Sequence, residues 1–190
     1  MPQDFITVVS GLPRSGTSMM MKILEAGGME ILFDNLRQAD EDNPKGYYEF
    51  EKVKQLKDDQ SWLNQAKGKA VKIISELLKH LPGDYRYKII FMQRKMEEIL
   101  ASQKQMLIRR GQPTDTISDE RIAEVFAKHL KKIESYMSKQ SNFEILHINY
   151  NDILKNPEER IKEINFFLGD SLDESKMLTV IDKQLHRQKR

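Results

Sequence analysis

Gly11-Leu-Pro-Arg-Ser-Gly-Thr-Ser18 is the stretch that decides how this chain folds. It lies between an apolar, β-branched run at 5–10 and a run with helical periodicity that begins at Thr17. A strand that passes through a glycine-containing loop into a helix directs backbone N–H groups and the positive end of the helix dipole at one point. The stretch therefore predicts an anion-binding loop. The alternative is an ordinary strand-to-helix turn in which Ser18 caps the helix.

The positively charged residue of this loop is at a different position from the lysine of the Walker A phosphate loop. Gly11 and Gly16 have Walker A spacing, but that motif requires Lys and then Ser or Thr after the second glycine. Here two hydroxyl residues follow, and the cation is Arg14, inside the loop. A guanidinium offers forked hydrogen bonds to an anion, and hydroxyl groups add further donors. We expect the ligand contacts to come from Arg14, Ser15, Gly16, Thr17 and Ser18.

The sequence offers no residues for a metal ion beside this loop. Magnesium-dependent P-loop enzymes hold the ion partly with an Asp at a strand end. The predicted strands at 87–92 and 143–148 are instead followed by Gln93-Arg94 and Asn149-Tyr150. The four histidines lack metal-ligand spacing, and there is no cysteine. We expect no metal, with protein cations neutralising the ligand.

Composition restricts the class of protein. A chain of 190 residues with 39% hydrophobic and 32% charged residues is typical of one globular domain, expected to span 1–190. The net charge of +2 gives no indication of a nucleic-acid partner. No apolar run approaches the roughly 20 residues that span a bilayer, and no signal peptide is apparent, so we expect no stable membrane insertion. The lack of cysteine fits a cytoplasmic protein, and the sequence specifies no oligomeric state.

Strands and helices are predicted to alternate along the chain. The predicted strands lie at 5–10, 29–33, 69–74, 87–92 and 143–148. The predicted helices lie at 17–26, 49–59, just before Pro82, and at 96–110, 118–137, 157–168 and 171–185, with a flexible basic tail at 186–190. This order predicts an α/β fold: a P-loop-like, three-layer α/β/α domain with a central, mostly parallel sheet of about five strands. Ligands bind outside the carboxyl ends of such strands, where the Gly11 loop and Arg94 are expected.

Three segments, at 12–18, 89–102 and 148–169, carry motifs in a familiar order. The first is Leu-Pro-Arg-Ser-Gly-Thr-Ser, and the second has Arg94 at a strand end with Ser102 eight residues on. The third runs from Ile-Asn-Tyr through Asn-Pro to Phe-Leu-Gly. They resemble the 5′-phosphosulfate loop, the 3′-phosphate motif and the Tyr-Glu-Asp-Leu…Asn-Pro…Phe-Leu-Gly segment of the PAPS-dependent sulfotransferases (PAPS is 3′-phosphoadenosine 5′-phosphosulfate). The chain is identified as a small, bacterial-type member of this family.

The resemblance implies a site for PAPS as the donor and for its product PAP (3′,5′-ADP). Arg14 and its loop would hold the 5′-phosphosulfate, Arg94 and Ser102 the 3′-phosphate, and Tyr150 would contact the nucleotide. A site selective for PAPS needs a second cationic pocket, because PAPS differs from ATP in carrying a 3′-phosphate. The alternatives are a surface or ion-paired Arg94, a helix-surface Ser102 and an ordinary core Tyr150.

The resemblance also implies in-line transfer of the sulfuryl group, without metal, to a hydroxyl or amine acceptor. Cytosolic members use as base a His two residues after a Lys; Lys72 matches the Lys, but Ile74 takes the His position. Other branches use a Glu, and Asn43-Pro-Lys-Gly-Tyr-Tyr-Glu49 resembles their Pro-x-Gly-Tyr-x-Glu stretch. The expected catalytic residues are therefore Arg14, Glu49 and Lys72, with Glu51 as the reserve base. The alternatives are a helix-start acid for Glu49 and a solvated strand residue for Lys72.

The chain departs from the family pattern near its C-terminus. Many relatives complete the 3′-phosphate site there with a basic, glycine-containing loop, whereas this chain has only Leu185-His-Arg-Gln-Lys-Arg190, in which Arg187 is a possible substitute. The chain is also short, so contacts to a small-molecule, glycan or lipid acceptor are expected from the loops at 34–48 and 111–117. Two other functions stay open: a P-loop nucleotide or small-molecule kinase, and a non-catalytic PAP- or PAPS-binding protein.

Overall fold

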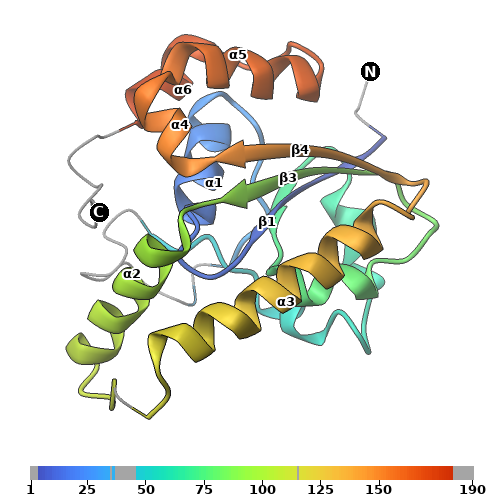
Figure 1. Ribbon diagram of the computed structural model, residues 1–190. Helices are drawn as coiled ribbons and strands as arrows, with labels where there is room; N and C mark the ends of the chain where they lie inside the picture. The colour runs from blue at the N-terminus through green and yellow to red at the C-terminus, as the bar shows by residue number, and fades with distance from the viewer. Residues whose placement is uncertain (1–3, 35, 37–45, 115, 182–190) are drawn as a thin grey trace.

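Four parallel strands form the central sheet of the computed structural model, which describes residues 4–34, 36, 46–114 and 116–181 (Figure 1). The strands are β1 (Ile6–Gly11), β2 (Ala70–Lys72), β3 (Tyr87–Gln93) and β4 (Phe143–Asn149). Within the described residues their order is β2-β1-β3-β4, and each neighbouring pair is parallel. The predicted α/β fold with a parallel sheet is confirmed. The runs that form β1 and β3 are apolar and β-branched, as expected for strands in the middle of the sheet, where both faces are covered.

The predicted fifth strand, at 29–33, is wrong. In this run only Ile31 forms a bridge, with Ala70 of β2. The N–H of Ala70 donates to the Glu30 carbonyl at 2.9 Å, and the N–H of Leu32 donates to the Ala70 carbonyl at 2.8 Å. Because β2 is only three residues long, it offers the run too short an edge for a continuous ladder.

Helices cover both faces of the sheet, so the predicted three-layer arrangement is confirmed (Figure 1). One face carries α1 (Thr17–Ala26), α4 (Tyr150–Lys155), α5 (Pro157–Leu168) and α6 (Glu174–Thr179). The other carries α3 (Asp119–Met137) and the short 3-10 helices η1 (Glu51–Gln55), η2 (Ser61–Ala66) and η3 (Ser75–His80). Alternate strand residues supply the two cores: Val9 and Ile90 pack on the α1 side, and Val8 and Ile89 pack on the α3 side.

Several predicted helices differ from those observed. The helix predicted at 49–59 is only the short 3-10 helix η1, because the run is mostly polar and only its Val53 and Leu56 are buried in the core. The helix α4 was not predicted, and of the helix predicted at 171–185 only the six-residue α6 is present within the described residues. The basic tail and Arg187 lie outside the part of the chain that the structure describes. None of the described helices combines the length and apolar character needed to cross a bilayer.

The strand order places the Gly11 loop beside the end of β3. The chain passes from β1 to β2 on one side and reaches β3 on the other, so the direction of winding reverses between β1 and β3. Open α/β sheets bind ligands at such a reversal, outside the carboxyl ends of the strands. Gly11 pairs with Met92 in register, and α2 (Met96–Arg109) extends from this end of β3 (Figure 1). The loop and Arg94 therefore meet at one edge of the sheet.

Candidate functional site

Two glycines let the loop fold closely against its neighbours. Gly11 and Gly16 have φ values of 147° and 101°, which residues with a side chain rarely adopt. A Cβ on Gly11 would lie 2.6 Å from the Met92 carbonyl oxygen, and one on Gly16 would lie 2.5 Å from a ring carbon of Tyr150. The glycine spacing in the sequence therefore reflects two close backbone approaches. Gly16 precedes α1 directly, so the loop ends at the helix N-terminus.

The loop also contains a buried hydroxyl group, that of Ser15. Ser15 is fully buried, and within the described residues its Oγ has no hydrogen-bond partner. An unsatisfied buried polar atom is costly, so native structures pair nearly all of them or reserve them for a ligand. A phosphate or sulfate oxygen on the loop would satisfy this donor. The residues present thus fit the anion that the sequence predicts here.

Arg94 lies at the carboxyl end of β3 and contacts the loop directly. Its Nη1 donates to the backbone carbonyl of Arg14 at 3.1 Å, and its Nε donates to Glu98 Oε2 at 2.8 Å. The guanidinium also lies over the Tyr150 ring, 4.3 Å from the ring centroid. The side chain is 8% exposed, which excludes a surface arginine. Arg94 is ion-paired, as one alternative held, and it also stands beside the anion loop.

Arg14 and Ser102 are in contact, although the sequence assigned them to different phosphate groups. Arg14 Nε donates to Ser102 Oγ at 2.9 Å. Ser102 is buried, which excludes a hydroxyl on the helix surface. It lies four residues after Glu98 on α2, so both side chains are on the same face of the helix. The two predicted phosphate-binding groups therefore form one continuous cluster.

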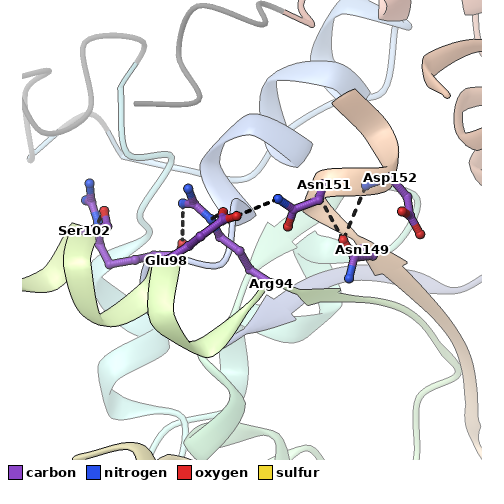
Figure 2. A network of polar contacts seen from close by, with 7 residues as sticks. Arg94, Glu98, Ser102, Asn149, Asn151 and Asp152 are labelled. Carbon is purple, nitrogen blue, oxygen red and sulfur yellow. Dashed lines mark hydrogen bonds and ion pairs between the residues drawn. The ribbon is translucent and has the colours of Figure 1, made fainter. Parts of the chain in front are cut away.

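Tyr150 is placed by the turn that begins α4. The Asn149 side chain accepts hydrogen bonds from the N–H groups of Asn151, at 2.8 Å, and Asp152, at 3.4 Å (Figure 2). This cap fixes the start of the helix, and the Tyr150 ring packs against Gly16 and Arg94. Tyr150 is buried within the core, as its alternative held, but the ring forms part of the candidate site as well.

Glu98 and Asn151 belong to the same cluster, and the sequence reasoning missed both roles. Asn151 Nδ2 donates to Glu98 Oε1 at 2.8 Å, so Glu98 bridges Asn151 and Arg94 (Figure 2). The spacing of four residues between Arg94 and Glu98 was a signal for this ion pair. No local signal connects Glu98 to Asn151, because 53 residues separate them.

A second group of side chains stands at the end of β2. The Lys72 side chain is 10% exposed, and its ammonium donates to the Tyr47 carbonyl and, at 3.4 Å, to Ser18 Oγ. The same ammonium lies 3.9 Å from Glu49 Oε1. A solvated strand lysine is therefore excluded. Lys72 joins the predicted base to the start of α1.

Glu49 is held at this place by its neighbours in the chain. Tyr47 is buried, and the hydroxyl of Tyr48 donates to Glu25 Oε2 at 2.6 Å. Burial and then the contact with Glu25 raise the pKa of Tyr48 well above its ordinary value, so the phenol stays a donor. Glu49 lies before the first turn of η1, so the helix-start alternative is wrong. The side chain of Glu51, the reserve base, is half exposed. Its Oε2 forms an ion pair with Lys54 Nζ at 2.7 Å.

The stretch that precedes Glu49 is described by the structure only from residue 46 onward. Asn43, Pro44 and Lys45, which carry part of the resemblance around Glu49, lie outside the described residues. Within the described residues, no group of three or more His, Asp or Glu side chains is placed to hold a metal ion. Metal independence stays a prediction.

Comparison with known families shows the family of this chain. A model of the sulfotransferase domain matches residues 4–189. The chain belongs to the sulfotransferase domain family. The family predicted from the three motifs is thereby confirmed. A search of curated protein sequences found no match.

Solved sulfotransferase structures share the fold at low sequence identity. The sulfotransferase domain of the curacin biosynthetic pathway superimposes with a TM-score of 0.53 and 15% identity, over 96% of this chain and 79% of that one. Sulfotransferase STF1 of Mycobacterium tuberculosis H37Rv gives 0.62 and 18%, over 93% and 71%. Mouse sulfotransferase SULT7A1, solved with PAP, gives 0.59 and 19%, over 94% of this chain and 62% of its own. The chain is thus shorter than these enzymes while it retains their common fold.

Proposed function

We propose that this chain transfers the sulfuryl group of PAPS to a hydroxyl or amine acceptor and releases PAP. The observation that carries the proposal is the continuous cluster in which Arg94 and Ser102 adjoin Arg14 and the anion loop. A site for ATP needs groups that bind one chain of phosphates. A site for PAPS must also bind the 3′-phosphate. The PAP bound to the mouse enzyme of the same fold supports this choice of product.

The loop is proposed to hold the 5′-phosphosulfate. The Ser15 hydroxyl and the N–H groups at the start of α1 are donors for its oxygens, and Thr17 and Ser18 stand at the same helix end. PAPS supplies a sulfuryl group bonded to a phosphate that can depart with the electron pair of the broken S–O bond. Arg14 is proposed to stabilise the negative charge that gathers at this position. The chain provides this cation itself, so no metal is required.

The 3′-phosphate is proposed to bind at the other end of the cluster. Arg94 offers a guanidinium of fixed orientation, and Ser102 offers a hydroxyl on the adjoining face of α2. A guanidinium forms two parallel hydrogen bonds with a phosphate, which gives direction as well as charge. Tyr150 presents a ring edge between this place and Gly16. These residues would distinguish PAP from ADP.

Glu49 and Lys72 are proposed to serve the acceptor. The Glu49 carboxylate lies 3.9 Å from the Lys72 ammonium, and its side chain is 31% exposed, so a hydroxyl or amine can reach it. The carboxylate would accept the acceptor's proton as the oxygen or nitrogen attacks sulfur in line with the departing phosphate. Lys72 lies beside the carboxylate and links it to Ser18 at the donor loop. The acceptor is proposed to be a small molecule, or a glycan or lipid with such a group.

Calorimetric titration with PAP, ADP and ATP, each with and without Mg²⁺, tests the proposal. We expect PAP to bind at least about tenfold more tightly than ADP, because the 3′-phosphate adds a charge-assisted interaction. Mg²⁺ should leave this affinity unchanged. Tighter binding of ATP with Mg²⁺ would indicate a kinase instead. PAP binding without PAP release from PAPS, over phenol, alcohol, amine and sugar acceptors, would indicate a binding protein.

A further inference from the structure

Glu98 is a buried carboxylate to which the proposed reaction gives no role. Its side chain is 1% exposed, at the centre of the cluster between α2 and α4. A carboxylate removed from water is strongly destabilising unless it is paired and hydrogen-bonded. Here each oxygen has a partner: Oε2 accepts from Arg94 Nε, and Oε1 accepts from Asn151 Nδ2, both at 2.8 Å (Figure 2).

The arrangement fixes the guanidinium of Arg94 from three sides. Glu98 holds Nε, the Arg14 carbonyl holds Nη1, and the Tyr150 ring lies against the planar face. Asn151 in turn holds the carboxylate, and its own backbone is set by the cap at Asn149. A guanidinium held in this way is oriented before any ligand arrives. Less conformational entropy of the Arg94 side chain is therefore lost when the ligand binds.

We propose that Glu98 and Asn151 are positioning residues that orient Arg94 for the 3′-phosphate of the donor. The inference rests on the proposed function, in which Arg94 binds that phosphate. Glu98 contacts Arg94 and is almost fully buried, so it acts through the guanidinium. The Arg94–Glu98 pair carries no net charge. Its contribution to recognition is therefore the direction in which the N–H donors of Arg94 point.

Two substitutions at Glu98 separate orientation from charge. Glu98→Ala removes the carboxylate that accepts from Arg94 Nε and leaves the contacts of Arg94 with the Arg14 carbonyl and the Tyr150 ring. Glu98→Gln keeps an oxygen that accepts from Arg94 Nε, and rotation of the Asn151 amide presents an acceptor to the new N–H group. If direction matters, Gln preserves selectivity for the 3′-phosphate and Ala does not. Asn151→Ala removes one donor to Glu98 Oε1 and should have a smaller effect.

The ratio of PAP affinity to ADP affinity, measured by calorimetry, is the decisive readout. ADP lacks the 3′-phosphate, so a general loss of stability lowers both affinities and leaves the ratio unchanged. We expect Glu98→Ala to lower the ratio by about tenfold and Asn151→Ala by about threefold, as for weakened charge-assisted hydrogen bonds. Glu98→Gln should stay within about threefold of the unaltered chain or exceed it. Glu97→Ala, at the exposed neighbouring carboxylate, is the matched control and should change nothing.

The outcomes separate failure of this inference from failure of the proposed function. If the unaltered chain does not prefer PAP to ADP, the proposed function is wrong. If it does, an unchanged ratio in Glu98→Ala overturns the positioning role, and so does an equal loss in Glu98→Gln. Melting curves establish that each variant is folded. Should Glu98→Ala not fold, Asn151→Ala and Glu98→Gln decide the matter, since only positioning predicts a loss in the first and retention in the second.

Discussion

The proposed donor side and the proposed acceptor side of this site are built in different ways. On the donor side, Arg94, Glu98, Ser102 and Tyr150 are nearly or fully buried and joined by hydrogen bonds of 2.8–3.1 Å or by ring contact. On the acceptor side, the Lys72–Glu49 pair spans 3.9 Å and Glu49 is 31% exposed. The proposed donor half is thus buried and oriented in advance, whereas the proposed base on the acceptor half is partly exposed. A shared donor favours a rigid site, and a variable acceptor favours one that can adapt.

The largest effect is expected at Arg14, the cation of the anion loop. Arg14→Ala should lower kcat for sulfuryl transfer by roughly a thousandfold, as for removal of a group that stabilises developing charge. Steady-state release of PAP from PAPS with a saturating acceptor measures it. Arg14→Lys should recover part of the rate, since it keeps the charge and loses the forked geometry. A kcat within tenfold of the unaltered enzyme in Arg14→Ala would remove Arg14 from the chemistry.

The acceptor side is tested by removing its base alone. Glu49→Gln should lower kcat by about a hundredfold or more, because the acceptor's proton then lacks a base. PAP affinity should stay the same, since Glu49 is not part of the donor cluster. Glu51→Gln is the matched control; it alters a carboxylate paired with Lys54 and should keep the full rate. Loss of PAP affinity in Glu49→Gln would contradict the separation of the two sides.

The close packing of the donor loop predicts a loss of stability at Gly16. Gly16→Ala forces a side chain at φ 101° into the Tyr150 ring, and should lower the free energy of unfolding by about 2–4 kcal/mol, or roughly 5–10 °C in Tm. Gly28→Ala is the control, since φ is 97° but nothing lies within 4 Å of the added Cβ. It should cost only about 1 kcal/mol. Equal melting temperatures for the two variants would mean that the Tyr150 contact has no energetic weight.

The smallest expected effect is at Ser102. Ser102→Ala removes one hydroxyl from the cluster, and the affinity for PAP should fall about fivefold, as for a hydrogen bond worth roughly 1 kcal/mol. Calorimetry with PAP and ADP measures it, and ADP should be nearly unaffected. An equal fall for both ligands would show that Ser102 acts only by supporting Arg14.

Most of the donor side could be predicted from the sequence because its residues belong to local motifs. The apolar runs and helical periods predicted the α/β order, and the loop glycines, Arg94 and Tyr150 follow strands that end at one edge of the sheet. The extra strand at 29–33 was predicted because β-propensity does not reveal the length of the neighbouring edge. The spacing of Arg94 and Glu98 was a local signal for their ion pair, but no local pattern encodes the burial of Glu98 or its bond with Asn151.

The central claim is that Arg94 recognises a second phosphate on the donor. Calorimetric affinities for PAP and ADP should be compared between the unaltered chain and Arg94→Ala, with Lys95→Ala, at an exposed neighbouring cation, as the control. The account predicts that Arg94→Ala weakens PAP by about ten- to a hundredfold, with ADP unchanged and Lys95→Ala without effect. A PAP-to-ADP ratio that is the same in Arg94→Ala and in the unaltered chain would contradict it.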